Sequence, residues 1–180
     1  MLSFEFSILD AIQHLRTGFG DVIMPFLSSL GNGGVIWLIL AVLFLLIPKY
    51  RKAGMALLVA LGIEVICCNL ILKPLVARIR PCDVNNAVQL LVARPTDFSF
   101  PSGHAGASFA AASALFFSRI KFWIPAAVLA ALIAFSRLYL YVHYPSDVLA
   151  GIMIGIVCGW LGYCLIGLAA AKLPQHKTFR

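Results

Sequence analysis

Long apolar tracts separated by short polar connections dominate this sequence of 180 residues. The tracts carry almost no charge, and Glu64 and His104 are the exceptions. A helix that crosses a bilayer needs roughly 20 predominantly apolar residues, so the pattern predicts about five spanning helices. The tracts cover residues 22–48, 53–72, 98–118, 122–136 and 148–171.

The N-terminal segment, residues 1–21, has a different pattern. Apolar side chains recur there at helical spacing, and charged residues occupy the other faces. This pattern is typical of an amphipathic helix that lies along the membrane interface. We therefore expect an all-α fold: one polytopic transmembrane helix bundle over residues 1–180, with an interfacial helix at its start. The apolar stripe consists of Phe4, Ile8, Ile12, Leu15 and Phe19.

The composition supports a membrane protein. Hydrophobic residues make up 62% of the chain and charged residues only 12%, whereas soluble domains usually carry about a quarter charged residues. The net charge of +7 would suggest a nucleic-acid partner in a soluble protein. Here the Lys and Arg residues fall mainly in short connections between apolar tracts, where orientation in the membrane explains them, so nucleic acid is not expected as a partner.

The charges also predict an orientation. With five spans, one side receives the connections at residues 49–52 and 119–121 and the C-terminal tail, which hold eight of the fourteen basic residues and no carboxylate. That side is expected to be cytoplasmic. The opposite side receives six of the seven acidic residues, but it also holds five cations, which suggests that an anion binds there. These cations are Lys73, Arg78, Arg80, Arg94 and Arg137.

Three polar clusters lie at the outer ends of the predicted spans: "KPLVARIRP", "PSGH" and "SRLYLYVHYPSD". Lysine supplies a compact positive charge, and arginine supplies a forked donor that matches phosphate oxygens. Lys73, Arg80 and Arg137 are therefore interpreted together as a clamp for a dianionic phosphoryl group. Each cation alone could simply extend from a helix end toward the interface, and the hypothesis depends on their joint occurrence.

The "PSGH" cluster predicts a helix start that binds an anion. Pro101 and Ser102 are favoured at helix N-termini, and Gly103 lets the backbone approach a ligand closely. The free N–H groups of such a turn attract phosphate. His104 follows in the first turn and could donate a proton to a departing oxygen.

The third cluster predicts a nucleophile. Asp147 follows His143 by four residues and can hold one ring nitrogen, so that the other nitrogen points at phosphorus. Arg137 and His143 are six residues apart, about 240° around a continuous helix. They can share a ligand only if the helix ends before His143, and Pro145 favours such a break.

In order and spacing, these clusters resemble the K-x6-R-P, P-S-G-H and S-R-x5-H-x3-D signature of the type 2 phosphatidic acid phosphatase superfamily, over residues 73–147. The resemblance implies a phosphatase that needs no metal or other cofactor. It implies that His143 forms a phosphohistidine, that Asp147 orients it and that His104 is the general acid. The implied phosphate-binding groups are Lys73, Arg80, Arg137 and the backbone of Ser102 and Gly103.

The expected substrate is a lipid phosphate or diphosphate, hydrolysed at the extracytoplasmic face of the plasma membrane. Undecaprenyl diphosphate ranks first, and phosphatidylglycerophosphate and phosphatidic acid are the alternatives. A vanadium haloperoxidase has a similar site, but those enzymes are typically soluble. A lipid-phosphate transporter or scramblase would use the cations without needing a histidine nucleophile. Sequence leaves open the oligomeric state, the role of Glu64, and whether residues 87–93 dip into the interface or cap the site.

Overall fold

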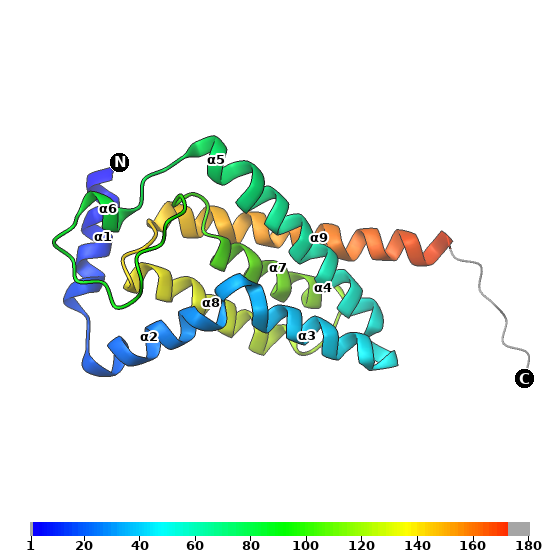
Figure 1. The fold of residues 1–180 in the computed structure, drawn as a ribbon. Coiled ribbons are helices and arrows are strands. Elements are labelled where there is room, and N and C mark those ends of the chain that lie inside the picture. Colours follow the sequence, from blue (N-terminus) through cyan, green and yellow to red (C-terminus); the bar gives the residue numbers. More distant parts are fainter. Residues whose placement is uncertain (1, 173–180) are drawn as a thin grey trace, which may run out of the picture.

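A computed structural model describes residues 2–172, and all secondary structure in this range is helical (Figure 1). The predicted all-α class is confirmed. Lys177 and Arg180, which contributed to the predicted orientation, lie outside the described residues. The helices are α1 (Leu2–His14), α2 (Gly18–Leu30), η1 (Asn32–Gly34), α3 (Val35–Leu46), η2 (Pro48–Tyr50), α4 (Arg51–Glu64), η3 (Val65–Leu72), α5 (Lys73–Val76), α6 (Pro81–Val84), α7 (Gly103–Phe117), α8 (Trp123–Tyr139) and α9 (Pro145–Lys172).

Helix α7 lies at the centre of the bundle and packs closely against α9 (Figure 1). Three glycines of α9, spaced four residues apart, face the backbone of α7. A Cβ atom on Gly155 would lie only 2.4 Å from the carbonyl oxygen of Gly106, and Gly151 and Gly159 are equally crowded. Small residues at this spacing allow helix backbones to approach closely, which is the usual basis of helix association in membranes.

The spans differ in form from five simple helices. Two stretches are long and apolar enough to cross a membrane, Pro48–Val84 with 37 residues and Pro145–Lys172 with 28. The tract 22–48 is not one helix, because α2 and α3 meet at a 46° bend. Gly33 and Gly34 form this bend with φ angles of 58° and 67°, a conformation that favours glycine. Since α7 and α8 have only 15 and 17 residues, the number of spans stays a prediction.

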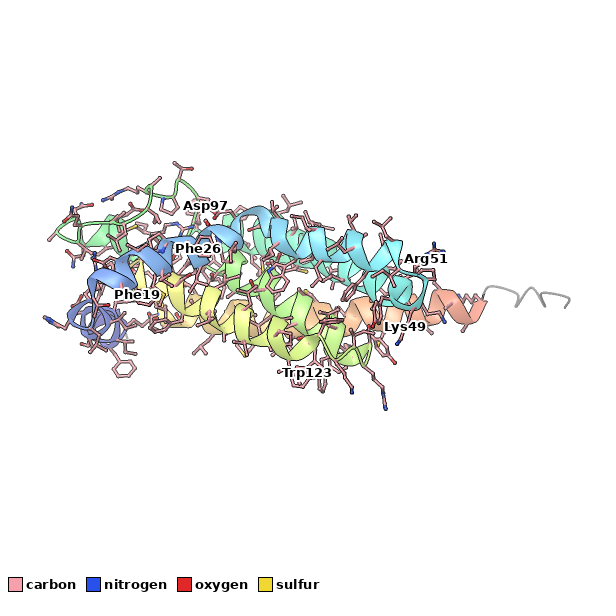
Figure 2. The ribbon with its side chains drawn as sticks, turned by 90° about the horizontal axis from the view of Figure 1, so that it is seen from below. Phe19, Phe26, Lys49, Arg51, Asp97 and Trp123 are labelled. Atoms are coloured by element: carbon pink, nitrogen blue, oxygen red, sulfur yellow. The ribbon has the colours of Figure 1, made fainter. Side chains whose placement is uncertain are left out.

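Helix α1 lies across one end of the bundle, roughly perpendicular to its long axis (Figures 1 and 2). It is shorter than the expected 1–21 segment, because it ends at His14 and Thr17 caps the separate helix α2. The face turned toward the bundle carries Glu5 and Leu9, which are buried. Of the predicted apolar stripe, Phe4 is exposed, as suits a helix whose outer face meets lipid, whereas Ile8 and Ile12 are half-buried.

The segment between α6 and α7 folds over the same end of the bundle as α1. Its apolar residues, among them Val88 and Leu91, pack against a buried cluster that includes Leu9, Tyr141 and Tyr144. The tract 87–93 is therefore packed against the protein. Figure 2 shows Lys49 and Arg51 at the opposite end of the molecule from Asp97 of this segment. The basic connections and the polar clusters thus lie at opposite ends, as the charge pattern predicts.

Candidate active site

The three polar clusters converge on one cavity of about 920 Å³. Six of the predicted residues line it, although they come from five different parts of the chain. Lys73 begins α5, Arg80 precedes α6, His104 lies in the first turn of α7, Arg137 lies near the end of α8, and His143 lies between α8 and α9. The cavity thus brings together both histidines and all three cations of the predicted phosphate clamp.

The "PSGH" turn forms the predicted helix start. Ser102 is the N-cap of α7, and its side chain accepts from the amide of Ala105 at 3.5 Å. The Ser102 amide itself donates to the main-chain oxygen of Asp147 at 3.0 Å. Ser102 is fully buried and does not line the cavity, whereas Gly103 does. The backbone contribution to phosphate binding that we expected of both residues is therefore supported by position only for Gly103.

His143 is buried in the short segment after α8, which ends four residues earlier. The predicted break before His143 is confirmed, and a left-handed turn at Tyr141, with φ 59°, redirects the chain there. The Nε2 atom of His143 lies 3.2 Å from Nη1 of Arg80. Because arginine can only donate, Nε2 is the acceptor, and the ring proton lies on Nδ1. The unprotonated nitrogen therefore faces the cationic end of the cavity.

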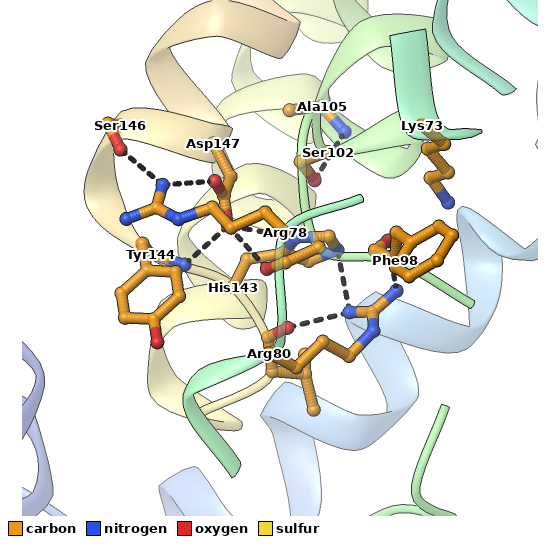
Figure 3. Close-up of polar contacts among 12 residues, drawn as sticks. Lys73, Arg78, Arg80, Phe98, Ser102, Ala105, His143, Tyr144, Ser146 and Asp147 are labelled. Carbon is orange, nitrogen blue, oxygen red and sulfur yellow. Dashed lines mark hydrogen bonds and ion pairs between the residues drawn. The ribbon is translucent and has the colours of Figure 1, made fainter. Parts of the chain in front are cut away.

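Asp147 lies behind His143 (Figure 3). Its Oδ2 atom is 3.6 Å from His143 Nδ1, within ion-pair range but longer than a hydrogen bond. The same oxygen accepts from the Ser99 hydroxyl at 2.5 Å and from the Tyr144 amide at 2.9 Å. Burial lowers the pKa of His143, and the positive charge of Arg80 adds to this effect although Asp147 opposes it. The imidazole is consequently neutral near pH 7, as a nucleophile must be.

Asp97 forms ion pairs with two of the three cations, Lys73 and Arg80. Arg80 Nη2 lies 2.7 Å from Asp97 Oδ1, Arg80 Nε donates to the main-chain oxygen of Asp97 at 2.8 Å, and Lys73 pairs with the other carboxylate oxygen. Burial raises the pKa of the Asp97 carboxyl, but the hydrogen bond from Lys73 and the charge of Arg80 outweigh it and lower the pKa to about 2. A carboxylate thus lies where the clamp would hold an anion.

The remaining cation and histidine are fixed by the bent region around α2 and α3. Arg137 donates to the Ser28 hydroxyl of α2, and among the residues described its Nε has no partner. Nε2 of His104 lies 2.9 Å from Oδ1 of Asn32, which opens η1 at the bend. The bend therefore places polar groups of the N-terminal half beside Arg137 and His104.

Glu64 lines the same cavity and is buried. It lies against the first turns of α7, since a Cβ on Gly106 would be 2.3 Å from Glu64 Oε1. That oxygen has no hydrogen-bond partner within the described part of the chain. Glu64 therefore lies beside the candidate site, and one oxygen of its carboxylate is unpaired among the described residues.

The site gathers groups of the kinds that phosphoryl transfer requires. It has an unprotonated histidine nitrogen, a second histidine, and cations around one cavity. Within residues 2–172, no group of three or more His, Cys, Asp or Glu side chains is arranged to hold a metal ion. The PAP2 superfamily model matches residues 53–170, which include all three clusters. The chain belongs to the PAP2 superfamily.

Curated and solved PAP2 relatives resemble most of the chain. An undecaprenyl-diphosphatase of Sulfolobus acidocaldarius is 31% identical over 90% of this chain and 77% of its own length. A lipid A 4'-phosphatase of Bacteroides thetaiotaomicron is 33% identical over 92% and 81%. The crystal structure of a PAP2 type phosphatidylglycerolphosphate phosphatase from Bacillus subtilis superposes with a TM-score of 0.76 at 25% identity, over 97% of this chain and 88% of that one. This PAP2 protein is accordingly a membrane phosphoric-ester hydrolase of a family that acts on lipid phosphates.

Several polar residues of this PAP2 site were not predicted from the sequence. Apart from Arg78, which lies inside the "KPLVARIRP" cluster, they contact the predicted residues from segments that carry no motif of their own. Ser99 lies two residues before Pro101 of the "PSGH" turn, and this position near a signature was the available signal for it. The others are Glu5, Ser28, Asn32, Arg78 and Asp97.

Proposed function

We propose that this protein hydrolyses a membrane lipid phosphate or diphosphate through a phosphohistidine on His143, at the extracytoplasmic face. The observation that carries the proposal is the orientation of His143. Its unprotonated Nε2 faces the cavity end that holds Lys73, Arg80 and Arg137, while its protonated Nδ1 faces Asp147.

In the first step, His143 Nε2 forms a bond to phosphorus as the bond from phosphorus to the departing oxygen breaks. The three cations stabilise the charge on the phosphoryl oxygens. His104 protonates the departing oxygen. The imidazole gains positive charge, which Asp147 stabilises from the Nδ1 side. In the second step, water attacks phosphorus with His104 as the base, the bond to Nε2 breaks, and inorganic phosphate leaves.

The cavity supports a lipid substrate because part of its wall is apolar. Besides the cations, it is lined by Leu38 of α3, Leu58 and Leu61 of α4, and Val65 of η3. Leu38 and Val65 are also exposed, at 42% and 45%. An acyl or prenyl chain could therefore pass from the surrounding bilayer to the phosphate clamp along an apolar wall.

Undecaprenyl diphosphate is our first candidate, supported by similarity to a protein with that activity. Phosphatidylglycerophosphate is the second, supported by the Bacillus subtilis structure. The extracytoplasmic face is supported by the basic connections at the opposite end of the bundle from the cavity.

The test is phosphate release by purified protein in detergent from undecaprenyl diphosphate, phosphatidylglycerophosphate and phosphatidic acid. We expect the highest kcat/KM on the diphosphate, no turnover by His143→Ala, and acid-labile labelling of the wild-type protein by substrate carrying radioactive terminal phosphorus. Activity of His143→Ala above a few per cent would overturn the mechanism. Lipid transport between leaflets without any phosphate release would favour a transporter instead.

A further inference from the structure

The strongest unassigned feature is a chain of charges that joins helix α1 to the nucleophile. Arg78 lies two residues before the clamp residue Arg80, yet it does not line the cavity. Its Nη1 donates to Asp147 Oδ1 at 2.5 Å, and its Nη2 donates to Glu5 Oε2 of α1 at 2.5 Å (Figure 3 shows the contact with Asp147). We propose that Arg78 and Glu5 are positioning residues that hold Asp147, and through it His143, in the reactive orientation.

Arg78 completes the hydrogen bonding of Asp147. The carboxylate uses Oδ2 for Ser99, the Tyr144 amide and the side facing His143, so only Oδ1 is left for Arg78. With both oxygens engaged, the carboxylate cannot rotate without breaking charge-assisted hydrogen bonds, which are the stronger class. Among the described residues, His143 Nδ1 has no hydrogen-bond partner and lies 3.6 Å from Asp147 Oδ2, so the orientation of this carboxylate aligns the ring from the Nδ1 side while Arg80 contacts Nε2.

Arg78 is itself held on several sides. Its guanidinium lies over the Tyr144 ring, 3.9 Å from the ring centroid, an arrangement that favours a cation. Nη1 also donates to the Ser146 hydroxyl at 2.7 Å, and that hydroxyl donates to Glu5 Oε1 at 2.5 Å. The planar fork of arginine suits these simultaneous contacts, whereas lysine offers a single donor centre.

Glu5 gives α1 a function beyond contact with the membrane. Its carboxylate is buried and accepts from Arg78, from the Ser146 hydroxyl and from the Ser146 amide at 3.1 Å. The Ser146 amide belongs to the first turn of α9, where the helix carries partial positive charge. Glu5 therefore stabilises both the cation that holds Asp147 and the start of the helix that carries Asp147.

The inference rests on the proposed nucleophile, so His143→Ala is assayed in parallel. We expect Arg78→Ala to lower kcat on the order of 10- to 100-fold, as when groups that orient a catalytic ligand are removed. We expect KM and the Ki for vanadate to change less than about twofold, because Arg78 does not line the cavity. Arg78→Lys should restore only part of kcat, since it keeps the charge and loses the fork.

A double-mutant cycle separates positioning from a general loss of packing. Glu5→Gln should lower kcat several-fold alone, but less than about twofold when added to Arg78→Ala, because the two act through one contact. Asp10→Asn is the matched control: it removes another α1 carboxylate, which accepts from the Tyr141 hydroxyl at 2.7 Å, and should leave kcat unchanged.

Three outcomes would overturn the inference while leaving the proposed function intact, provided that His143→Ala stays inactive. They are full activity of Arg78→Ala, independent effects of Glu5→Gln and Arg78→Ala, and an equal loss in Asp10→Asn. If His143→Ala is active, the proposed function itself fails. Thermal unfolding of each variant in detergent identifies any variant that is merely misfolded, and Arg78→Lys then replaces Arg78→Ala in the cycle.

Discussion

Asp97 pairs with two cations of the proposed phosphate clamp, and its removal should tighten the binding of phosphate analogues. Asp97→Asn keeps the shape of the side chain and the main-chain oxygen that accepts from Arg80 Nε. It removes the negative charge that pairs with Lys73 and Arg80. An incoming vanadate dianion would no longer have to displace a carboxylate from both cations.

The structure sets the size of this effect. The Asp97 side chain is 51% exposed, so each ion pair is worth about 0.2–1 kcal/mol, as for exposed pairs. The Arg80 partner is only 3% exposed, which favours the upper part of that range. Two pairs therefore give about 1–2 kcal/mol, which corresponds to a fall in the vanadate Ki of about 5- to 30-fold.

The assay is the Ki for vanadate against phosphate release from one lipid, at fixed pH and ionic strength. With its pKa lowered to about 2, Asp97 is ionised at every practical assay pH. Its pairing therefore persists above the unfolded pKa of 3.8 and is lost only as the pH falls through about 2. The ionisation of Asp97 therefore does not change between about pH 5 and pH 8, so it should not alter the ratio of the wild-type Ki to the Asp97→Asn Ki over this range.

Asp21→Asn is the control, because Asp21 pairs with Arg16 at 3.0 Å and neither residue lines the cavity. Its Ki should equal that of the wild type. An unchanged or raised Ki in Asp97→Asn would refute the reasoning, since it would mean that Asp97 supports the clamp and does not compete with its ligand.

His104→Ala should lower kcat by ~10² to 10⁴ on a phosphatidyl monophosphate and distinctly less on a polyprenyl diphosphate, whose leaving group is already stable as an anion. Equal losses, with chemistry rate-limiting, would assign His104 to phosphate binding. Gly155→Ala should destabilise the fold by about 1–3 kcal/mol because its Cβ would meet the Gly106 carbonyl. Thermal unfolding checks this against Gly167→Ala, where nothing lies within 4 Å. Phosphate release should persist after exhaustive chelation, and a strict magnesium requirement would contradict the proposed charge stabilisation.

The spacing of residues along the sequence was enough to predict the helical class of this protein and several residues of its candidate site. Apolar tracts of about the length of a bilayer predicted a helical membrane protein, because backbone groups in lipid must be satisfied within each segment. Ser102 was predicted as a helix cap and Pro145 as the mark of a chain break, because both depend on backbone geometry within a few residues. The signature residues Lys73 and His143 were identified by order and spacing, and both line the cavity.

Tertiary structure alone decided which groups surround those residues. Glu5 contacts Arg78 across 73 positions and Ser146 across 141, and no local pattern indicates such a pair. The same holds for Asp97 on the phosphate clamp and Asn32 beside His104. A helical pattern predicts which residues share a face, but not which face is buried, so Glu5 could be read as a polar residue of an interfacial helix. Its burial depends on a cation and a helix start supplied by distant segments, and these meet it only when the chain is folded.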